Sequence, residues 1–204
     1  MRKIFITGIG TDVGKTVISA ILTEALQADY WKPIQAGFED GTDKLRVKNW
    51  ISNTISQFHE EQFLLKEPMS PHAAAELENK NIQLSDFKLP NCNNSNLIIE
   101  GAGGLLVPIN NTHVVADLIM CLDAEVLLVS RNYLGSINHT LLTLNELLSR
   151  KLKISGIIFN GEKNEATESI ILSKYKFPFV GRVNFHEEIN KNVILGYSSQ
   201  FKSI

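Results

Sequence analysis

The stretch Thr7-Gly8-Ile9-Gly10-Thr11-Asp12-Val13-Gly14-Lys15-Thr16 lies between a short apolar run and a segment with helical periodicity. Its glycines let the backbone curl so that N–H groups point inward, and the following helix start adds its dipole. Such a loop binds phosphates: Lys15 would reach the β- and γ-phosphates of a nucleotide, and the Thr16 hydroxyl would bind a metal ion. The usual pattern has four residues between the first glycine and Gly-Lys, whereas five lie between Gly8 and Gly14. The alternative is a glycine-rich turn with an incidental Gly-Lys-Thr.

Apolar runs alternate with longer amphipathic segments, which is typical of β-α-β units. Runs such as Val126-Leu127-Leu128-Val129 are apolar at consecutive positions, as in strands covered by helices on both faces. We therefore expect an α/β fold with a doubly wound, mostly parallel sheet, the P-loop NTPase fold, in one domain over residues 1–204. The predicted strands are Lys3–Thr7, Tyr30–Ile34, Asn96–Ile99, Glu125–Ser130, Ile154–Asn160 and Phe179–Val183. The predicted helices are Gly14–Leu26, Lys44–Ser56, Pro71–Glu78, Val114–Leu122, Ser136–Arg150 and Ala166–Lys174.

The charge balance of 20 Lys and Arg against 22 Asp and Glu offers no basic surface for nucleic acid or an anionic membrane. A small-molecule partner is expected. The two cysteines, Cys92 and Cys121, have no Cys-x-x-Cys spacing, so neither a disulfide framework nor structural zinc is indicated. Ile4-Phe5-Ile6 is too short for a secretory segment, and no run approaches the roughly 20 apolar residues of a membrane helix. These features predict a cytoplasmic protein.

Three charged residues lie at or just after the ends of predicted strands. Lys32 precedes Pro33, Asp43 follows the second strand, and Glu100 ends a buried strand before a second glycine-rich segment. Ligands of open α/β sheets bind outside the carboxyl ends of the strands, so these residues are expected near the phosphate loop. Two carboxylates with Thr16 suit Mg²⁺, which prefers oxygen ligands and phosphates. The alternatives are a solvated lysine and acids that only cap strand ends.

These motifs together resemble the dethiobiotin synthetase family. The resemblance rests on Gly8–Thr16, Lys32-Pro33, Glu67–His72, Glu100–Gly104 and Leu134–His139, in the family's order and up to about Asn160. It implies a cytoplasmic ligase of biotin biosynthesis that closes the ureido ring of dethiobiotin from 7,8-diaminopelargonic acid, carbon dioxide and ATP. It also implies Mg²⁺, no nucleic-acid or membrane partner, and a homodimer with the substrate site at its interface.

The resemblance also implies a role for each matching residue. The catalytic residues would be Lys32 and Lys15. The metal would be held by Thr16, Asp43 and Glu100. The substrate would be bound by Thr11, Ala36, Gly135, Ser136 and Asn138. The nucleotide would be bound by Asp12, Val13, Gly14, Lys15, Thr16, Val17, Asp43, Glu100, Gly101, Ala102, Gly103, Asn160, Gly161, Asn184, Phe185 and His186.

Some positions depart from the family pattern or allow a simpler interpretation. Ala36 stands where a serine or threonine is common, Gly161 where an acid is usual, and Asp12 is one methylene shorter than the usual glutamate. Ser136 would look the same as a plain helix N-cap, and Asn160 as a residue that ends a strand.

Two other functions remain open from the sequence. A related P-loop ligase acting on another amine or carboxylate would carry the same nucleotide residues. A nucleotide-dependent switch like the partition and division-site ATPases would carry a signature lysine five residues before Lys15, and that position is Gly10.

Overall fold

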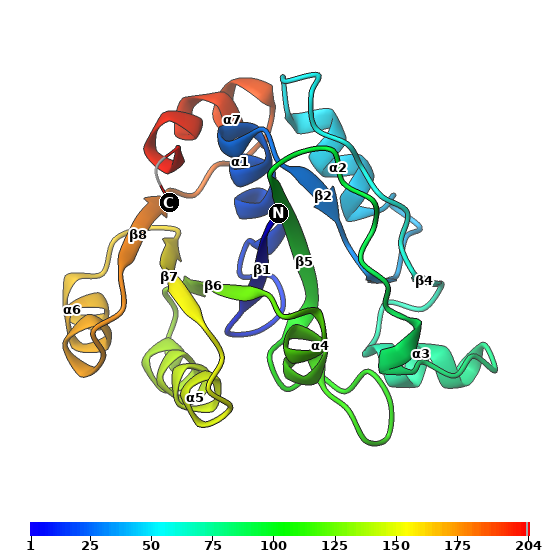
Figure 1. Ribbon diagram of the computed structural model, residues 1–204. Coiled ribbons are helices and arrows are strands. Elements are labelled where there is room, and N and C mark those ends of the chain that lie inside the picture. Colours follow the sequence, from blue (N-terminus) through cyan, green and yellow to red (C-terminus); the bar gives the residue numbers. More distant parts are fainter. Residues whose placement is uncertain (203) are drawn as a thin grey trace.

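The computed structural model describes residues 1–202 and 204. Its centre is a six-stranded sheet in the order β2-β5-β1-β6-β7-β8 (Figure 1). All of its neighbouring strands pair in parallel, which confirms the predicted doubly wound sheet. The strands are β1 (Arg2–Gly8), β2 (Asp29–Trp31), β5 (Asn96–Gly104), β6 (Glu125–Arg131), β7 (Ile154–Asn160) and β8 (Phe179–Val183). A separate parallel pair contains β3 (Ile34–Ala36) and β4 (Phe63–Leu65).

Helices cover both faces of the sheet (Figure 1). Helices α1 (Lys15–Leu26), α2 (Asp43–Trp50) and α7 (Lys191–Ser198) contribute to one apolar core. Helices α3 (Pro71–Leu77), α4 (Val115–Leu122), α5 (Ser136–Ser149) and α6 (Glu165–Lys174) contribute to the other. Short 3₁₀ turns lie at Leu84–Asp86 and Ser199–Phe201. Across the described residues, no helix has the length and apolarity needed to cross a membrane.

The consecutive apolar residues of β1 serve both cores. Ile4 and Ile6 pack on the side of α1 and α7, whereas Phe5 packs on the side of α4 and α5. Because side chains alternate across a strand, an uninterrupted apolar run is what a strand buried on both faces requires. This explains why the consecutive apolar pattern predicted the covered sheet correctly.

The predicted strand Tyr30–Ile34 is wrong as one element. It divides into β2, which ends at Trp31 beside β5, and β3, which begins at Ile34 and pairs with β4. Pro33 has no backbone N–H to donate to a ladder, so the chain leaves the main sheet there. The strand predicted over Asn96–Ile99 continues to Gly104, so the second glycine-rich segment is largely extended strand.

The helix predicted over Lys44–Ser56 ends at Trp50. The Glu24 carboxylate accepts hydrogen bonds from the backbone N–H groups of Ser52 and Asn53, and the Asn53 side chain accepts from Ile55 and Ser56. These bonds satisfy the backbone in a non-helical path. Helix α7 and strand β4 were missed, because each is short and has no strong periodic pattern.

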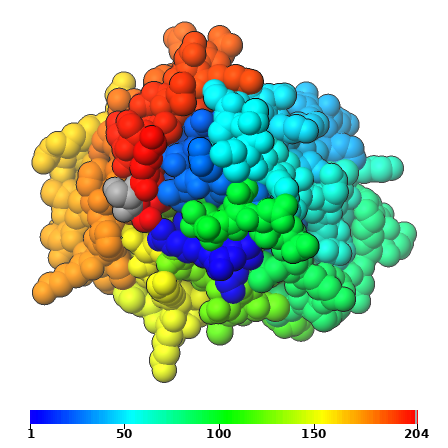
Figure 2. All heavy atoms as spheres, turned by 45° about the horizontal axis from the view of Figure 1, so that its top comes forward, coloured from blue at the N-terminus to red at the C-terminus, as the bar shows by residue number. Residues whose placement is uncertain are grey.

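The amino end of the central sheet is held by charged contacts. Arg2 pairs with Glu125 at the start of β6 and donates to the backbone oxygen of Ile204, so the two ends of the chain lie side by side (Figure 2). Lys153 pairs with Glu125 at 2.8 Å. Burial acts to raise the pKa of Glu125, but the hydrogen bonds from Lys153 and Arg2 outweigh it and lower the pKa below its ordinary value of 4.5.

Replacing Glu125→Gln is expected to lower the free energy of unfolding at pH 7 by about 1 kcal/mol, since Arg2 and Lys153 are partly exposed. Because the folded-state pKa is depressed, the advantage of the wild type is present above pH 4.5 and disappears as the pH falls through the folded pKa. Urea unfolding from pH 7 to pH 3 measures this. Glu165→Gln, which removes an exposed pair with Lys163, is the control and should change nothing measurable. Equal curves for Glu125→Gln and wild type at pH 7 would contradict the assignment.

Candidate active site

The predicted phosphate loop joins β1 to α1, and its conformation depends on Gly14. This glycine is the N-cap of α1 with φ of 97°, a left-handed conformation that side chains rarely adopt. A Cβ atom there would lie 2.1 Å from Asn160 Nδ2. No side chain caps the helix, so the N–H groups of its first turn are available to an anion.

Lys15 folds back across this loop. Its side chain is buried, and Nζ donates to the Gly10 carbonyl at 2.9 Å. Burial lowers the pKa of Lys15 to about 8, although the Glu100 carboxylate acts in the opposite direction. The ammonium therefore lies over the loop, where a phosphate bound to the backbone N–H groups would meet it.

Glu100 has a fully buried carboxylate at the carboxyl end of the central sheet. Its Oε1 accepts from Thr16 Oγ1 at 2.8 Å and from Lys32 Nζ at 3.1 Å. Its Oε2 accepts from the Tyr30 hydroxyl at 2.9 Å. Burying an ionised carboxylate is costly unless it is paired and hydrogen-bonded, and here both oxygens have partners.

Lys32 lies between two carboxylates, since Nζ also pairs with Asp43. Only 6% of this lysine is exposed, so the interpretation of a solvated lysine at a strand end is wrong. Burial acts to lower the pKa of Lys32, but Glu100 and Asp43 outweigh it and raise the pKa above its ordinary value. Gln35 positions the second acid, because its Oε1 accepts from the Asp43 backbone N–H at 3.0 Å.

The oxygen atoms of Thr16, Asp43 and Glu100 form a set suited to Mg²⁺. They are a hydroxyl and two carboxylates, and the carboxylates already surround the positive charge of Lys32. Hard oxygen donors beside a phosphate loop are what Mg²⁺ requires. The residues present therefore fit this ion.

Two grooves of about 1240 and 820 Å³ open on either side of the phosphate loop and share Asp12, Gly14 and Val17. The second groove contains the phosphate and carboxylate residues described above. It is lined by Thr11, Lys15, Thr16, Lys32, Ala36, Asp43, Glu100, Ala102 and Gly103, all of which the sequence had singled out. The sequence-based expectation that the phosphate loop and the three strand-end charges meet in one crevice is therefore matched by the geometry.

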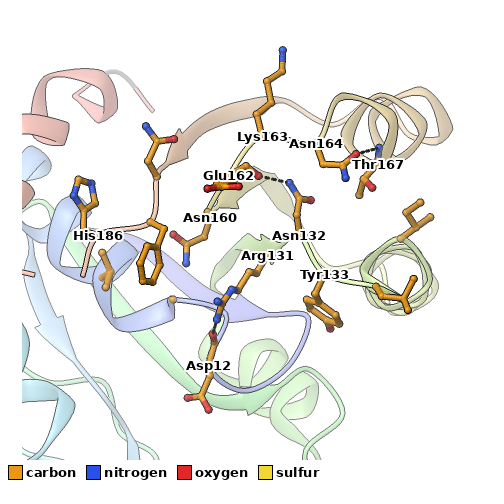
Figure 3. A pocket seen from close by; sticks show the side chains of 18 of the residues that line it. Asp12, Arg131, Asn132, Tyr133, Asn160, Glu162, Lys163, Asn164, Thr167 and His186 are labelled. Carbon is orange, nitrogen blue, oxygen red and sulfur yellow. Dashed lines mark hydrogen bonds between the residues drawn. The ribbon is translucent and has the colours of Figure 1, made fainter. Parts of the chain in front are cut away.

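The first groove is shown in Figure 3. Asn160 reaches from the end of β7 to the loop, where Nδ2 donates to the Val13 carbonyl at 2.9 Å. Arg131, from the end of β6, donates to the Asp12 carbonyl at 3.2 Å. The groove also contains the remaining predicted base-side residues, which are Gly161, Asn184, Phe185 and His186.

The residues predicted to bind substrate are divided between the grooves. Thr11 and Ala36 line the second groove, whereas Gly135 and Asn138 line the first. Ser136 is buried in the first turn of α5, and Gly135 is the N-cap, so the plain interpretation of Ser136 as an N-cap is wrong. Within one chain, α5 therefore faces the first groove and not the groove of Lys32.

Two predicted nucleotide residues line neither groove. Val13 is buried and offers its carbonyl to Asn160. Gly101 is buried against the Phe5 ring, where an added Cβ atom would lie 2.7 Å from a ring carbon. Their contribution to the site is the shape of the backbone.

Tyr30 was missed by the sequence interpretation. It is fully buried, and burial and the Glu100 charge raise its pKa well above the ordinary value. One signal was available, since Tyr30 and Lys32 are two residues apart across a predicted strand and so share a face. Gln35 was also missed, and nothing in its local pattern indicates the contact with Asp43.

The glycine-rich loop between the first strand and the first helix, with Lys15 above it and Thr16 beside buried acids, defines a P-loop nucleotide-binding protein. Residues 2–193 match the profile of a family described as an AAA domain. The chain is 53% identical to the ATP-dependent dethiobiotin synthetase of Cytophaga hutchinsonii, covering 97% of this chain and 96% of the relative. It is 49% identical to the one from Christiangramia forsetii, covering 98% and 96%. The protein belongs to the ATP-dependent dethiobiotin synthetase family.

Solved structures show the same fold at low identity. A ParA family ATPase from Chlorobium tepidum matches with a TM-score of 0.53 and 16% identity, covering 98% of this chain and 92% of the other. MinD of Aquifex aeolicus, in a MinC:MinD cell division complex, matches with a TM-score of 0.56 and 15% identity, covering 98% and 95%. These similarities confirm the P-loop fold.

Replacing Tyr30→Phe removes one donor from a fully buried carboxylate, so we expect the free energy of unfolding to fall by about 1–3 kcal/mol. Urea unfolding followed by circular dichroism measures this at pH 7. Tyr175→Phe is the matched control, because its hydroxyl bonds with Asn145 at the surface, and its effect should stay within about 0.5 kcal/mol. If both variants lower the free energy of unfolding by the same amount, the hydrogen bond from Tyr30 to Glu100 contributes no more to stability than a surface hydrogen bond.

Proposed function

We propose that this protein converts 7,8-diaminopelargonic acid, carbon dioxide and ATP into dethiobiotin, ADP and phosphate, as a ligase of biotin biosynthesis. The observation that carries the proposal is Lys32, a buried ammonium held by Glu100 and Asp43 in the same groove as the phosphate loop. Membership of the dethiobiotin synthetase family supports it. A positive charge at this place suits a reaction in which negative charge moves between a carboxylated amine and a phosphoryl group.

The chemistry has three steps. One substrate amine attacks carbon dioxide and loses a proton, giving a carbamate. A carbamate oxygen attacks the γ-phosphorus of ATP, the bond to the β-phosphate oxygen breaks, and ADP leaves. The second amine then attacks the carbonyl carbon of this mixed anhydride and loses a proton to solvent, and inorganic phosphate leaves as the ring closes. Each step needs positioned charge more than a nucleophilic side chain, because phosphoryl transfer depends on alignment and electrostatic stabilisation.

The predicted site residues of the second groove each have a part in this scheme. Lys32 stabilises the carbamate and the transferring phosphoryl group. Lys15 and the loop backbone from Asp12 to Val17 hold the phosphates, while Thr11 and Ala36 contact the substrate. Ala36 offers no hydroxyl, so the substrate lacks one hydrogen bond of about 0.5–1.5 kcal/mol that a serine there would supply.

Mg²⁺ would be held by Thr16, Asp43 and Glu100. When bound, the ion would neutralise phosphate charge and support the in-line geometry of transfer. Lys32 already supplies positive charge to Asp43 and Glu100, so these acids have a partner before the nucleotide arrives.

The first groove suits the nucleoside of ATP. Asn160 presents an amide that can pair with a base edge, and Gly161, Asn184, Phe185 and His186 line the groove around it. Gly101 to Gly103 shape the backbone opposite the loop. We assign the whole of residues 1–204 to one catalytic domain, acting in the cytoplasm, where both free cysteines would remain reduced.

We further propose a homodimer with the substrate site at its interface. Leu134, just before α5, and Ile137 and Leu148, on one face of α5, are exposed and form an apolar stripe, and Leu134 and Ile137 line the first groove. In such a dimer, Gly135, Ser136 and Asn138 of one chain would reach the Lys32 groove of the other. The start of α5 has no side-chain cap, so its N–H groups are available to the substrate carboxylate.

The proposed reaction is tested by following phosphate release from purified protein with ATP, Mg²⁺, bicarbonate and 7,8-diaminopelargonic acid. Phosphate should appear only with the diamine, together with dethiobiotin detected by mass spectrometry. Absence of diamine-dependent phosphate would overturn the proposal. Phosphate release stimulated by a different amine or carboxylate would favour a related ligase instead.

Lys32→Ala is expected to lower kcat by about 10²–10³-fold, because it removes positive charge that acts on the transferring group. The affinity for ATP with saturating Mg²⁺, measured by calorimetry, should change by only a few-fold. Lys44→Ala is the matched control: Lys44 also pairs with two carboxylates, Glu60 and Glu61, but lies outside both grooves. An unchanged kcat in folded Lys32→Ala protein would sink the catalytic assignment.

Leu134→Lys is expected to convert the protein from two chains to one in light scattering, since a charge in the apolar stripe opposes association. Activity per chain should fall with it, because the substrate site would be incomplete. Leu77→Lys, an equally drastic change at an exposed leucine on α3, should leave the mass and the activity unaltered. A wild-type protein that stays a single chain at assay concentration would contradict the dimer.

A further inference from the structure

A second cluster of polar side chains lies apart from both grooves. Asp29 begins β2, His59 lies in the segment beside it, and Cys92 precedes β5. The carboxylate oxygen, ring nitrogen and sulfur of these residues all lie within 4.8 Å of one another. None of the three lines the grooves around the phosphate loop.

The two distances from His59 to the other residues of this cluster match edges of a metal tetrahedron. His59 Nε2 lies 3.5 Å from Asp29 Oδ2 and 3.5 Å from Cys92 Sγ. Tetrahedral zinc with ordinary bond lengths separates a nitrogen from an oxygen ligand by about 3.3 Å and from a sulfur ligand by about 3.6 Å. One ring nitrogen thus faces two other ligand atoms at the spacing that zinc imposes. A hydrogen on His59 Nε2 could form a good hydrogen bond with only one of the two other atoms, whereas a metal ion could bind the nitrogen, the oxygen and the sulfur together.

The Asp29 carboxylate is oriented as a ligand would be. It is fully buried, and its Oδ1 accepts from the Gln57 backbone N–H at 2.9 Å and from Asn94 Nδ2 at 2.6 Å. Its Oδ2 is buried, forms no hydrogen bond of normal geometry among the described residues, and lies 3.5 Å from His59 Nε2. A carboxylate with one oxygen fixed by hydrogen bonds and the other facing a second ligand atom is typical of a metal ligand with a second layer of hydrogen bonds.

Backbone contacts fix the other two ligands near Asp29. Tyr30 forms a parallel bridge with Phe58, in which Tyr30 N–H donates to the Gln57 carbonyl and His59 N–H donates to the Tyr30 carbonyl. This holds His59 beside the start of β2. Cys92 is half-buried, and its Sγ lies beside His59 Nε2.

We propose that Asp29, His59 and Cys92 form a binding site for Zn²⁺, with water as the fourth ligand. A thiolate, an imidazole and a carboxylate are each ligand types that bind zinc, and three protein ligands with one water complete its four-coordinate shell. Binding replaces the thiol proton of Cys92, which passes to solvent, by a bond between sulfur and zinc. The three residues lie far apart along the chain and form no motif, so structural zinc was not predicted from the sequence.

The site would stabilise one particular strand. Asp29 is at one end of β2, Tyr30 follows it and donates to Glu100, and Lys32 lies just beyond the other end. Since β2 is an edge strand only three residues long, a metal ion joining it to the segments of His59 and Cys92 would hold it against β5. Zinc here would have a structural role, distinct from that of Mg²⁺ at the phosphate groove.

The full-length protein, freed of metal by a chelator, should be titrated with Co²⁺ in the presence of excess Mg²⁺ and ADP. A thiolate ligand to Co²⁺ gives a near-ultraviolet charge-transfer band that oxygen ligands in the phosphate groove do not give. We expect this band to saturate at one Co²⁺ per chain and to vanish on addition of Zn²⁺. Zinc should also raise the melting temperature of the metal-free protein.

The variants should separate ligands from neighbours. Cys92→Ser should lose the band, and His59→Gln and Asn94→Ala should weaken Co²⁺ binding at least about tenfold. Cys121→Ser, which removes the other free cysteine, should behave as wild type. Circular dichroism checks that each variant is folded. If Cys92→Ser is unfolded, the His59→Gln and Asn94→Ala variants test the proposal instead. A wild-type protein without the band, or a band lost in Cys121→Ser and kept in Cys92→Ser, overturns the proposal. Neither result depends on the ring-closing activity.

Discussion

The buried carboxylate of Glu100 is the constraint on which the arrangement of the site depends. An ionised acid without water must be paired and hydrogen-bonded, or it destabilises the fold by several kcal/mol. Its partners come from three places: Thr16 at the start of α1, Tyr30 in β2 and Lys32 just after it. Satisfying this one side chain therefore holds the first helix and the edge strand in register with β5, where Trp31 stands opposite Ile99.

The two buried lysines of the second groove have opposite pKa shifts because their surroundings differ. Lys15 and Lys32 are both buried, yet the pKa of Lys15 is lowered and that of Lys32 is raised. The difference is contact: Lys32 touches two carboxylates, whereas Lys15 bonds only to a carbonyl of its own loop. A phosphate would provide Lys15 with the counter-charge that Lys32 already has. Lys15 therefore has no carboxylate partner and can pair with an incoming anion, whereas Lys32 is already paired with Asp43 and Glu100.

Local patterns predicted most of the sheet and the main residues of the crevice. The uninterrupted apolar runs marked strands covered on both faces, and the residues that follow those runs, Lys32, Asp43 and Glu100, line one groove with the phosphate loop. The features that the sequence did not predict depend on contacts between distant segments. The end of α2 depends on Glu24, the role of Gln35 on the path of β3, and the cluster around Asp29 on segments 30 and 33 residues apart. Neither periodicity nor a sequence motif indicates contacts of this kind.

The hydrogen bond from Asn160 to the Val13 carbonyl joins residues 147 positions apart, and its donor would lie 2.1 Å from a Cβ atom added to Gly14. The amide that lines the first groove therefore also supports the backbone of the phosphate loop. The length of the Asn160 side chain therefore sets the distance between the end of β7 and the phosphate loop. A shorter side chain would let the phosphate loop relax, and a longer one would push β7 away from it. The position of the phosphate loop and that of the end of β7 are therefore coupled through one side chain.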